Sequence, residues 1–134
     1  MLVQEPLSTR RPSVLIAERE RLIAMELAHQ LEDRGYNVCA ITSFGQDALF
    51  LAQQCRPDLL VLDVLLGDGM SGRDVARAIN TQRTTPVVFL STWSDQQIDH
   101  SGLLSCWWRC LLKPFTAEDL AASLNELTLG GNST

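Results

Sequence analysis

Apolar and polar residues alternate along the chain with two different periods. Short runs of aliphatic and β-branched residues predict strands at residues 14–17, 36–41, 59–62, 87–90 and 110–112. Between these runs, apolar residues recur at helical spacing, which predicts helices around residues 23–31, 44–55, 75–79, 95–104 and 116–127. The chain therefore alternates strand and helix along most of its length.

Residues typical of helix ends support these boundaries. Gly35 follows the first helical stripe, where a helix commonly ends in a left-handed residue, and Pro57 ends the second stripe. Thr116 precedes the last stripe, and Asp119 follows three residues later, which is the spacing of a capping box. Residues 66–72 (LGDGMSG) contain three glycines and are expected to form a loop.

The run Leu59–Leu62 contains no polar residue. Strands of this kind are buried on both faces, as in parallel sheets that are covered by helices on both sides. With right-handed crossovers, the alternation predicts an α/β fold: a doubly wound, five-stranded parallel sheet of order 2-1-3-4-5 with five helices, flavodoxin-like. The domain is expected to span residues 13–128, with flexible tails at residues 1–12 and 129–134.

Composition and charge narrow the classes of protein to which the chain can belong. A length of 134 residues suits one domain, and no segment approaches the ~20 apolar residues of a membrane span. The first residues lack the layout of a signal peptide, so a cytoplasmic location away from membranes is expected. A net charge of −5 without a basic stripe disfavours nucleic-acid binding. The four cysteines are expected to be reduced. A zinc site formed by Cys106 and Cys110 is disfavoured, because the sequence has no second pair of ligands at zinc spacing.

Four chemically useful side chains follow the predicted strands. Glu18 follows the first strand and Asp63 the third, while Ser91 follows the fourth and Lys113 the fifth. In the order 2-1-3-4-5 the first and third strands are neighbours, and ligands bind beyond their carboxyl ends. A carboxylate beside a second acid, a hydroxyl and an ammonium suits phosphoryl transfer to the carboxylate, because positioning and charge neutralisation dominate that reaction.

The same residues lie in motifs that resemble the receiver domain of bacterial two-component signalling. The matching segments are VLIAERE at the first strand, PDLLVLD ending in Asp63, PVVFLS ending in Ser91, and LLKPF with Lys113. The resemblance implies that Asp63 is the phosphoacceptor, that the Ser91 hydroxyl swings toward the phosphoryl group, and that Lys113 pairs with it. It also implies that a sensor histidine kinase or a phosphotransfer protein donates the phosphoryl group.

The resemblance further implies a Mg²⁺ site formed by Glu18, Asp63 and the backbone carbonyl of Leu65. The chain departs from the family at Arg19, where receivers carry an acid that contacts the ion. At ~4 Å and an effective dielectric constant of ~20, a guanidinium repels each unit of positive charge by about 4 kcal/mol. Three interpretations remain open. In the first, Arg19 takes the place of the metal and pairs with Asp63. In the second, Arg19 points to solvent while Glu18 and Glu20 hold a weakened ion. In the third, the domain serves only for docking.

The residues that transmit the signal in receivers also differ here. The family couples the hydroxyl to an aromatic residue three places before the lysine, but this chain has Cys110 at that position. Trp107 and Trp108 lie just upstream, so either one of them is exposed or both pack in the interior. A downstream protein partner or a homodimer is expected on the face formed by the fourth helix, the fifth strand and the last helix.

Two other classes of function compete with phosphoryl acceptance. A pseudo-receiver would bind its partner without phosphorylation, with Arg19 in the metal position. Among enzymes, haloacid-dehalogenase-like phosphatases need an acid where this chain has Leu65, and flavodoxins need a phosphate-binding loop where it has ERERL. An enzymatic role is therefore disfavoured. The chain is expected to be either a stand-alone regulator or a receiver from a larger protein.

Overall fold

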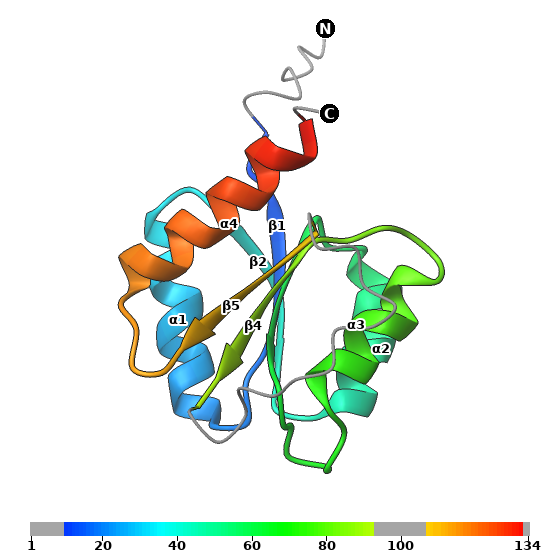
Figure 1. Ribbon diagram of the computed structural model, residues 1–134. Helices are drawn as coiled ribbons and strands as arrows, with labels where there is room; N and C mark the ends of the chain where they lie inside the picture. The colour runs from blue at the N-terminus through cyan, green and yellow to red at the C-terminus, as the bar shows by residue number, and fades with distance from the viewer. Residues whose placement is uncertain (1–9, 93–106, 133–134) are drawn as a thin grey trace, which may run out of the picture.

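The computed structural model describes residues 10–92 and 107–132, and Figure 1 shows the arrangement of their helices and strands. The elements are β1 (Ser13–Ala17), α1 (Arg21–Asp33), β2 (Asn37–Thr42), α2 (Gly45–Cys55), β3 (Leu59–Asp63), α3 (Gly72–Asn80), β4 (Val87–Ser91), β5 (Trp108–Leu112) and α4 (Ala117–Asn132). All five predicted strands are present. The helix predicted around residues 95–104 lies outside the described residues, which contain the other four predicted helices.

The five strands form one parallel sheet in the order β2-β1-β3-β4-β5, as predicted. β3 lies in the centre between β1 and β4, and all of its residues are buried. In the register, Leu62 lies beside Ala17, and Asp63 lies beside Leu90. The residues that follow β1 and β3 therefore meet at the carboxyl edge of the sheet.

Helices cover both faces of the sheet, and two separate apolar layers result (Figure 1). In the first layer, α1 and α4 pack on one face, with Leu31 and Leu124 buried. In the second layer, α2 and α3 pack on the other face, with Ala48 and Val75 buried. Successive residues of β3 enter alternate layers, which explains why its sequence is apolar without interruption.

The helix ends largely follow the signals in the sequence. Gly35 has a φ of +95°, the left-handed conformation predicted after α1. Thr116 and Asp119 form the predicted capping box, in which each backbone N–H donates to the side chain of the other residue at 3.0 Å. The C-cap of α2 is Arg56, which adopts a left-handed φ of 46° immediately before Pro57.

Several details of the prediction are wrong. α4 continues to Asn132, beyond the expected end of the domain at residue 128. Gly72 begins α3 and is not part of the preceding loop. Ile23 and Phe44 begin the first two helical stripes, but their side chains are 38% and 48% exposed; Ile23 lies in the first turn of α1, and Phe44 precedes α2. None of the helices in the described residues is long and apolar enough to cross a membrane.

Candidate functional site

The carboxyl edge of the sheet gathers the side chains that follow four of the strands. Glu18 follows β1, and Asp63 and Ser91 end β3 and β4; all three are buried. Lys113 follows β5, and its backbone N–H donates to the Ser91 carbonyl at 2.8 Å. These residues come from distant parts of the sequence and lie at one edge, as the predicted strand order requires.

Lys113 links the two acids. Its Nζ lies 2.9 Å from Asp63 Oδ1 and 3.4 Å from each carboxylate oxygen of Glu18. The other oxygen of Asp63, Oδ2, accepts a hydrogen bond of 2.8 Å from the backbone N–H of Arg19. Each oxygen of Asp63 therefore has a donor, which fixes the orientation of the carboxylate. We call Glu18, Asp63 and Lys113 the acid–lysine cluster.

Burial and neighbouring charges set the ionisation of this cluster. Glu18 is fully buried, and this desolvation, together with the hydrogen bond and charge of Asp63, raises the pKa of Glu18 to about 7. Burial alone would lower the pKa of Lys113, but the hydrogen bonds and charges of Asp63 and Glu18 outweigh it and raise that pKa. Lys113 is therefore charged at neutral pH, whereas Glu18 titrates near neutrality.

The side chain of Arg19 does not pair with Asp63. Arg19 is exposed, and its guanidinium forms no ion pair or hydrogen bond within residues 10–92 and 107–132. The interpretation in which Arg19 pairs with Asp63 in place of the metal is therefore wrong, because the guanidinium lies in solvent. Arg19 contributes its backbone N–H instead, which any residue except proline would supply. Sequence patterns describe side chains, so this contact was not predicted.

Gly72 packs directly against the backbone of Asp63. A Cβ at this position would collide with the Asp63 carbonyl oxygen, and the Gly72 N–H donates to the Val64 carbonyl at 3.0 Å. Space alone therefore requires a glycine here. The sequence indicated Gly72 as one of three glycines in a loop, and it gave no sign of this close approach.

Asp68 attaches the turn after β3 to the start of α2. Its carboxylate accepts hydrogen bonds from the backbone N–H groups of Gly45 at 2.9 Å and Gln46 at 3.0 Å, and these bonds lower the pKa of Asp68. The start of α2 thus receives a capping acceptor from another segment of the chain. Asp68 positions the turn and lies outside the acid–lysine cluster.

The acids of the cluster have the chemistry of ligands for a hard divalent cation. Glu18 and Asp63 are neighbouring carboxylates, and burial first, with the hydrogen bond and charge of Asp63 second, raises the pKa of Glu18. Leu65, whose carbonyl is the expected third ligand, lies in the turn after β3 and forms an isolated bridge with Ser71. The described residues hold no group of three or more acidic, histidine or cysteine side chains suited to a metal. Two carboxylates are donors that suit a hydrated Mg²⁺, because this ion commonly binds through one or two carboxylates and keeps several waters.

Ser91 faces a thiol at the same edge. Ser91 Oγ lies 3.4 Å from Cys110 Sγ, so Cys110 occupies the place for which the resemblance implies an aromatic ring. Cys110 is exposed, on the edge strand β5. Trp107 and Trp108 are both partly buried, and the Trp108 ring centroid lies 6.4 Å from that of Phe89 in the second layer. The alternative with one exposed Trp is therefore wrong.

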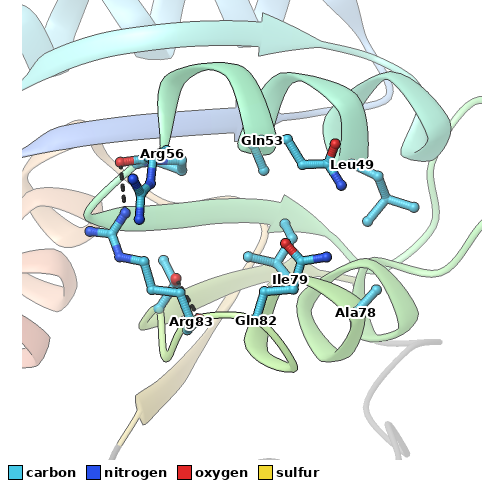
Figure 2. Close-up of a pocket in the computed structure, with 10 residues that line it drawn as sticks. Leu49, Gln53, Arg56, Ala78, Ile79, Gln82 and Arg83 are labelled. Atoms are coloured by element: carbon cyan, nitrogen blue, oxygen red, sulfur yellow. Dashed lines mark hydrogen bonds between the residues drawn. The ribbon is translucent and has the colours of Figure 1, made fainter.

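The surface has two grooves, one away from the cluster and one beside it. One, of about 510 Å³, runs between α2 and α3, and Figure 2 shows Leu49 and Ile79 along it and Arg83 donating to the Arg56 carbonyl at 3.1 Å. Arg56 and Arg83 follow the carboxyl ends of α2 and α3, so this groove lies toward the edge of the sheet opposite Asp63. The second groove, of about 500 Å³, is lined by α1 and by residues 113–117, and it includes Lys113.

In sequence, the chain is similar to response regulators. The sequence model of the response regulator receiver domain matches residues 14–125. The transcriptional regulatory protein PdtaR of Mycobacterium tuberculosis is 35% identical over 111 residues, which cover 83% of this chain and 54% of PdtaR. The DNA-binding response regulator MtrA of Mycobacterium bovis is 31% identical over 116 residues, which cover 87% of this chain and 50% of MtrA. The chain thus spans about half the length of the curated relatives it matches.

Solved structures share the fold. The solution structure of the Erythrobacter litoralis PhyR response regulator REC domain has a TM-score of 0.80 at 23% identity and covers 95% of this chain and 97% of that chain. The crystal structure of the response regulator PhyR from Brucella abortus has a TM-score of 0.76 at 26% identity and covers 93% of this chain and 52% of that chain. The first likeness concerns the fold alone, because its sequence identity is low.

Proposed function

Because the chain belongs to the response regulator receiver domain family, we propose that it accepts a phosphoryl group on Asp63 from a sensor histidine kinase or a phosphotransfer protein. One observation carries this proposal: Lys113 Nζ lies 2.9 Å from Asp63 Oδ1, at the end of a buried central strand. The ion pair orients the acceptor carboxylate and provides positive charge for the incoming phosphoryl oxygens. In this proposal the domain acts as a cytoplasmic signalling module and not as an enzyme.

In the proposed reaction, a carboxylate oxygen of Asp63 attacks the phosphorus atom of a phosphohistidine. The P–N bond of the donor breaks as the O–P bond to Asp63 forms, and the histidine nitrogen keeps the bonding electron pair. Positioning and charge neutralisation provide most of the rate enhancement in such a transfer. Lys113 pairs with one phosphoryl oxygen, and the Ser91 hydroxyl leaves its contact with Cys110 and donates to another.

In this proposal, Glu18, Asp63 and the backbone carbonyl of Leu65 hold a hydrated Mg²⁺, which supplies further positive charge when it is bound. Lys113 already contacts both acids, and position 19 adds a positive charge in place of a third acid. Weak Mg²⁺ binding follows from this composition. Lys113 therefore provides a larger share of the charge neutralisation than it would beside three acids.

The groove that includes Lys113 suits a helix of the phosphoryl donor. Ile23, Leu27 and Phe115 give it apolar walls. Leu22 and Met25 are further apolar side chains of α1 outside the groove lining, with exposed fractions of 80% and 48%. An amphipathic helix seated against this surface would bring a phosphohistidine close to the carboxyl edge of the sheet.

A mass measurement tests the proposal. The purified protein is incubated with Mg²⁺ and acetyl phosphate as a small-molecule donor, and its intact mass is determined. We expect the native chain to gain one phosphoryl group and Asp63→Asn to gain none. Asp74→Asn removes an exposed acid from the first turn of α3 and should leave the gain unchanged. No gain in the native chain, or an equal gain in Asp63→Asn, would contradict phosphoryl acceptance at this residue.

One observation favours a second candidate function, that of a module that binds its partner without phosphorylation. Both oxygens of Asp63 already accept hydrogen bonds, from Lys113 and from the backbone N–H of Arg19. A carboxylate held in this way can serve as a fixed structural element. This candidate predicts that the chain remains unmodified by donor and Mg²⁺, and that Asp63→Asn binds the partner as tightly as the native chain does.

The face that contains β5 and α4 is proposed to bind the output partner, either another protein or a second copy of this chain. β5 is an edge strand, and Cys110 is exposed on it. The net charge of −5 favours protein partners over nucleic acid or an anionic membrane.

A further inference from the structure

Cys39 of β2 and Cys55, the last residue of α2, are in direct contact. Their Sγ atoms are 2.8 Å apart, and the Cys55 thiol donates to the Leu51 carbonyl at 3.1 Å. Both thiols are free and partly buried. An S–S bond is about 2.05 Å long, so a small movement of either side chain brings the two sulfur atoms from 2.8 Å to bonding distance.

A β-bulge directs Cys39 toward Cys55. The register of β2 against β1 passes from Val38 directly to Ala40, so Cys39 is the extra residue of the bulge. Successive residues of a regular strand point to opposite faces, yet Cys39 and Ala40 both pack against the second layer, which contains α2. The irregularity of the strand therefore places the Cys39 thiol on the same side of the sheet as Cys55.

We propose that Cys39 and Cys55 form a reversible intramolecular disulfide when the chain meets a disulfide oxidant such as glutathione disulfide. In the first step, the thiolate of Cys55 attacks glutathione disulfide, which forms a mixed disulfide and releases one glutathione thiolate. In the second step, Cys39 attacks the Cys55 sulfur and releases the second glutathione thiolate. The two protons lost by the cysteines protonate the two leaving thiolates, so two thiols are oxidised and one glutathione disulfide is reduced.

The surroundings of the two thiols set the order of attack. Burial, together with the hydrogen bond and charge of Cys55, raises the pKa of Cys39 to about 12, so Cys39 is protonated at neutral pH and is a poor first nucleophile. The Cys39 thiol also donates to the Cys55 sulfur at 2.8 Å, so we assign the first attack to Cys55. When it carries glutathione, Cys39 lies next to the mixed disulfide, and closure within the molecule is favoured over exchange with a thiol from solution.

The disulfide would cross-link the edge strand β2 to the end of α2. The cross-link would close the loop between Cys39 and Cys55 and so restrict the unfolded chain. For a domain of this size, the typical stabilisation by such a disulfide corresponds to a rise in Tm of about 10 °C. β2 also supports the acid–lysine cluster, because its Thr42 carbonyl accepts the Glu18 N–H at 3.0 Å. Oxidation would therefore stabilise the strand that positions the start of the site.

The test uses the full chain with Cys106→Ser and Cys110→Ser, in which Cys39 and Cys55 are the remaining cysteines. After treatment with glutathione disulfide, we expect a mass two hydrogens below that of the reduced protein and a cross-linked peptide that joins Cys39 to Cys55. We also expect a rise in apparent Tm of about 10 °C that dithiothreitol reverses.

Cys39→Ser in the same background is the matched control, and it should stop at the mixed disulfide on Cys55. Circular dichroism establishes that the variant is folded, and Cys39→Ala repeats the test with a different side chain. A glutathione adduct that persists on the chain with both cysteines would overturn the proposal. The proposal would also be overturned if Cys39 and Cys55 remained unmodified under conditions that oxidise a model dithiol peptide.

Discussion

The acid–lysine cluster and the Ser91–Cys110 pair lie at the same edge of the sheet, but they are built in different ways. In the cluster, buried charges hold one another, with Lys113 2.9 Å from Asp63 and in contact with Glu18. The Ser91–Cys110 pair is joined by a contact of 3.4 Å between a hydroxyl and an exposed thiol. On the proposed function, this difference predicts that the acid–lysine cluster serves acceptance of the phosphoryl group, whereas Cys110 serves transmission of the change through its contact with Ser91.

The acid–lysine cluster and the Ser91–Cys110 pair differ in the free energy that a substitution would cost. Removing one partner of a buried ion pair leaves a charge without compensation, which commonly costs about 3–5 kcal/mol. The loss of a single hydrogen bond at an exposed position costs about 1 kcal/mol. We therefore expect substitutions in the acid–lysine cluster to affect both folding and phosphorylation, and substitutions of Cys110 to affect mainly the response that follows.

The largest effect is expected from Lys113→Met, which leaves Glu18 and Asp63 together without their cation. The free energy of unfolding should fall by about 3 kcal/mol, at the lower end for buried pairs because the Lys113 side chain is 30% exposed. Urea denaturation at pH 7 measures the change. Arg83→Met is the matched control, because it breaks an exposed ion pair with Asp58 and should cost less than about 1 kcal/mol. Equal losses in the two variants would remove the distinction between the cluster and the surface.

The next effect concerns pH and Glu18. The pKa of Glu18 is raised from 4.5 to about 7 in the folded protein, so its contribution to stability is full below pH 4.5 and is lost as the pH rises through 7. Relative to Glu18→Gln, which does not titrate, the native chain should lose about 3 kcal/mol between pH 4.5 and pH 8. Denaturation of both proteins at several pH values measures this difference. Glu26→Gln alters an exposed acid of α1, and its difference from the native chain should not depend on pH. If the difference in free energy of unfolding between Glu18→Gln and the native chain did not change with pH, the raised pKa of Glu18 would be contradicted.

A third, smaller effect is expected from Gly72→Ala. The added methyl group would meet the Asp63 carbonyl oxygen, and the resulting shift should lower the free energy of unfolding by about 1.5 kcal/mol and slow phosphorylation. Gly69→Asn is the control, because Gly69 has open space around it and a φ of +85°, a left-handed conformation that asparagine tolerates. Denaturation and the rate of mass gain measure the two effects. If Gly72→Ala and Gly69→Asn changed the free energy of unfolding and the rate of phosphorylation equally, the contact between Gly72 and the Asp63 carbonyl would not matter for function.

The smallest change in stability is expected from Cys110→Tyr, which places a ring where the thiol contacts Ser91. Because the position is exposed, stability should change by no more than about 0.5 kcal/mol, and the extent of phosphorylation should be retained. The change in tryptophan fluorescence on phosphorylation should be larger than in the native chain, whereas the control Cys110→Ser should resemble the native chain. Loss of phosphorylation in Cys110→Tyr would show that acceptance and transmission are not separable.

The architecture could be predicted because it depends on patterns that extend along the chain. The unbroken apolar run of β3 indicated a strand buried on both faces, and the strand order then brought Asp63, Glu18 and Lys113 to one edge. The contacts of Lys113 with both acids agree with that expectation.

Contacts of the backbone could not be predicted in the same way. The sequence left three interpretations of Arg19 open, and in the structure its side chain is exposed while its N–H donates to Asp63. Gly72 gave no sign that it packs against the Asp63 carbonyl. The bulge at Cys39 breaks the two-residue alternation of a strand, so the contact between Cys39 and Cys55 appears in no sequence pattern.

The position of the phosphoryl group is the most direct test of acceptance by Asp63. Borohydride reduces an aspartyl phosphate to homoserine, and tandem mass spectrometry then locates the converted residue. After treatment with acetyl phosphate and Mg²⁺, we expect homoserine at position 63 in the native chain and a much lower yield in Lys113→Met. A native chain without conversion at position 63, or one modified at another acid such as Glu18, would contradict the assignment of Asp63 as the phosphoacceptor.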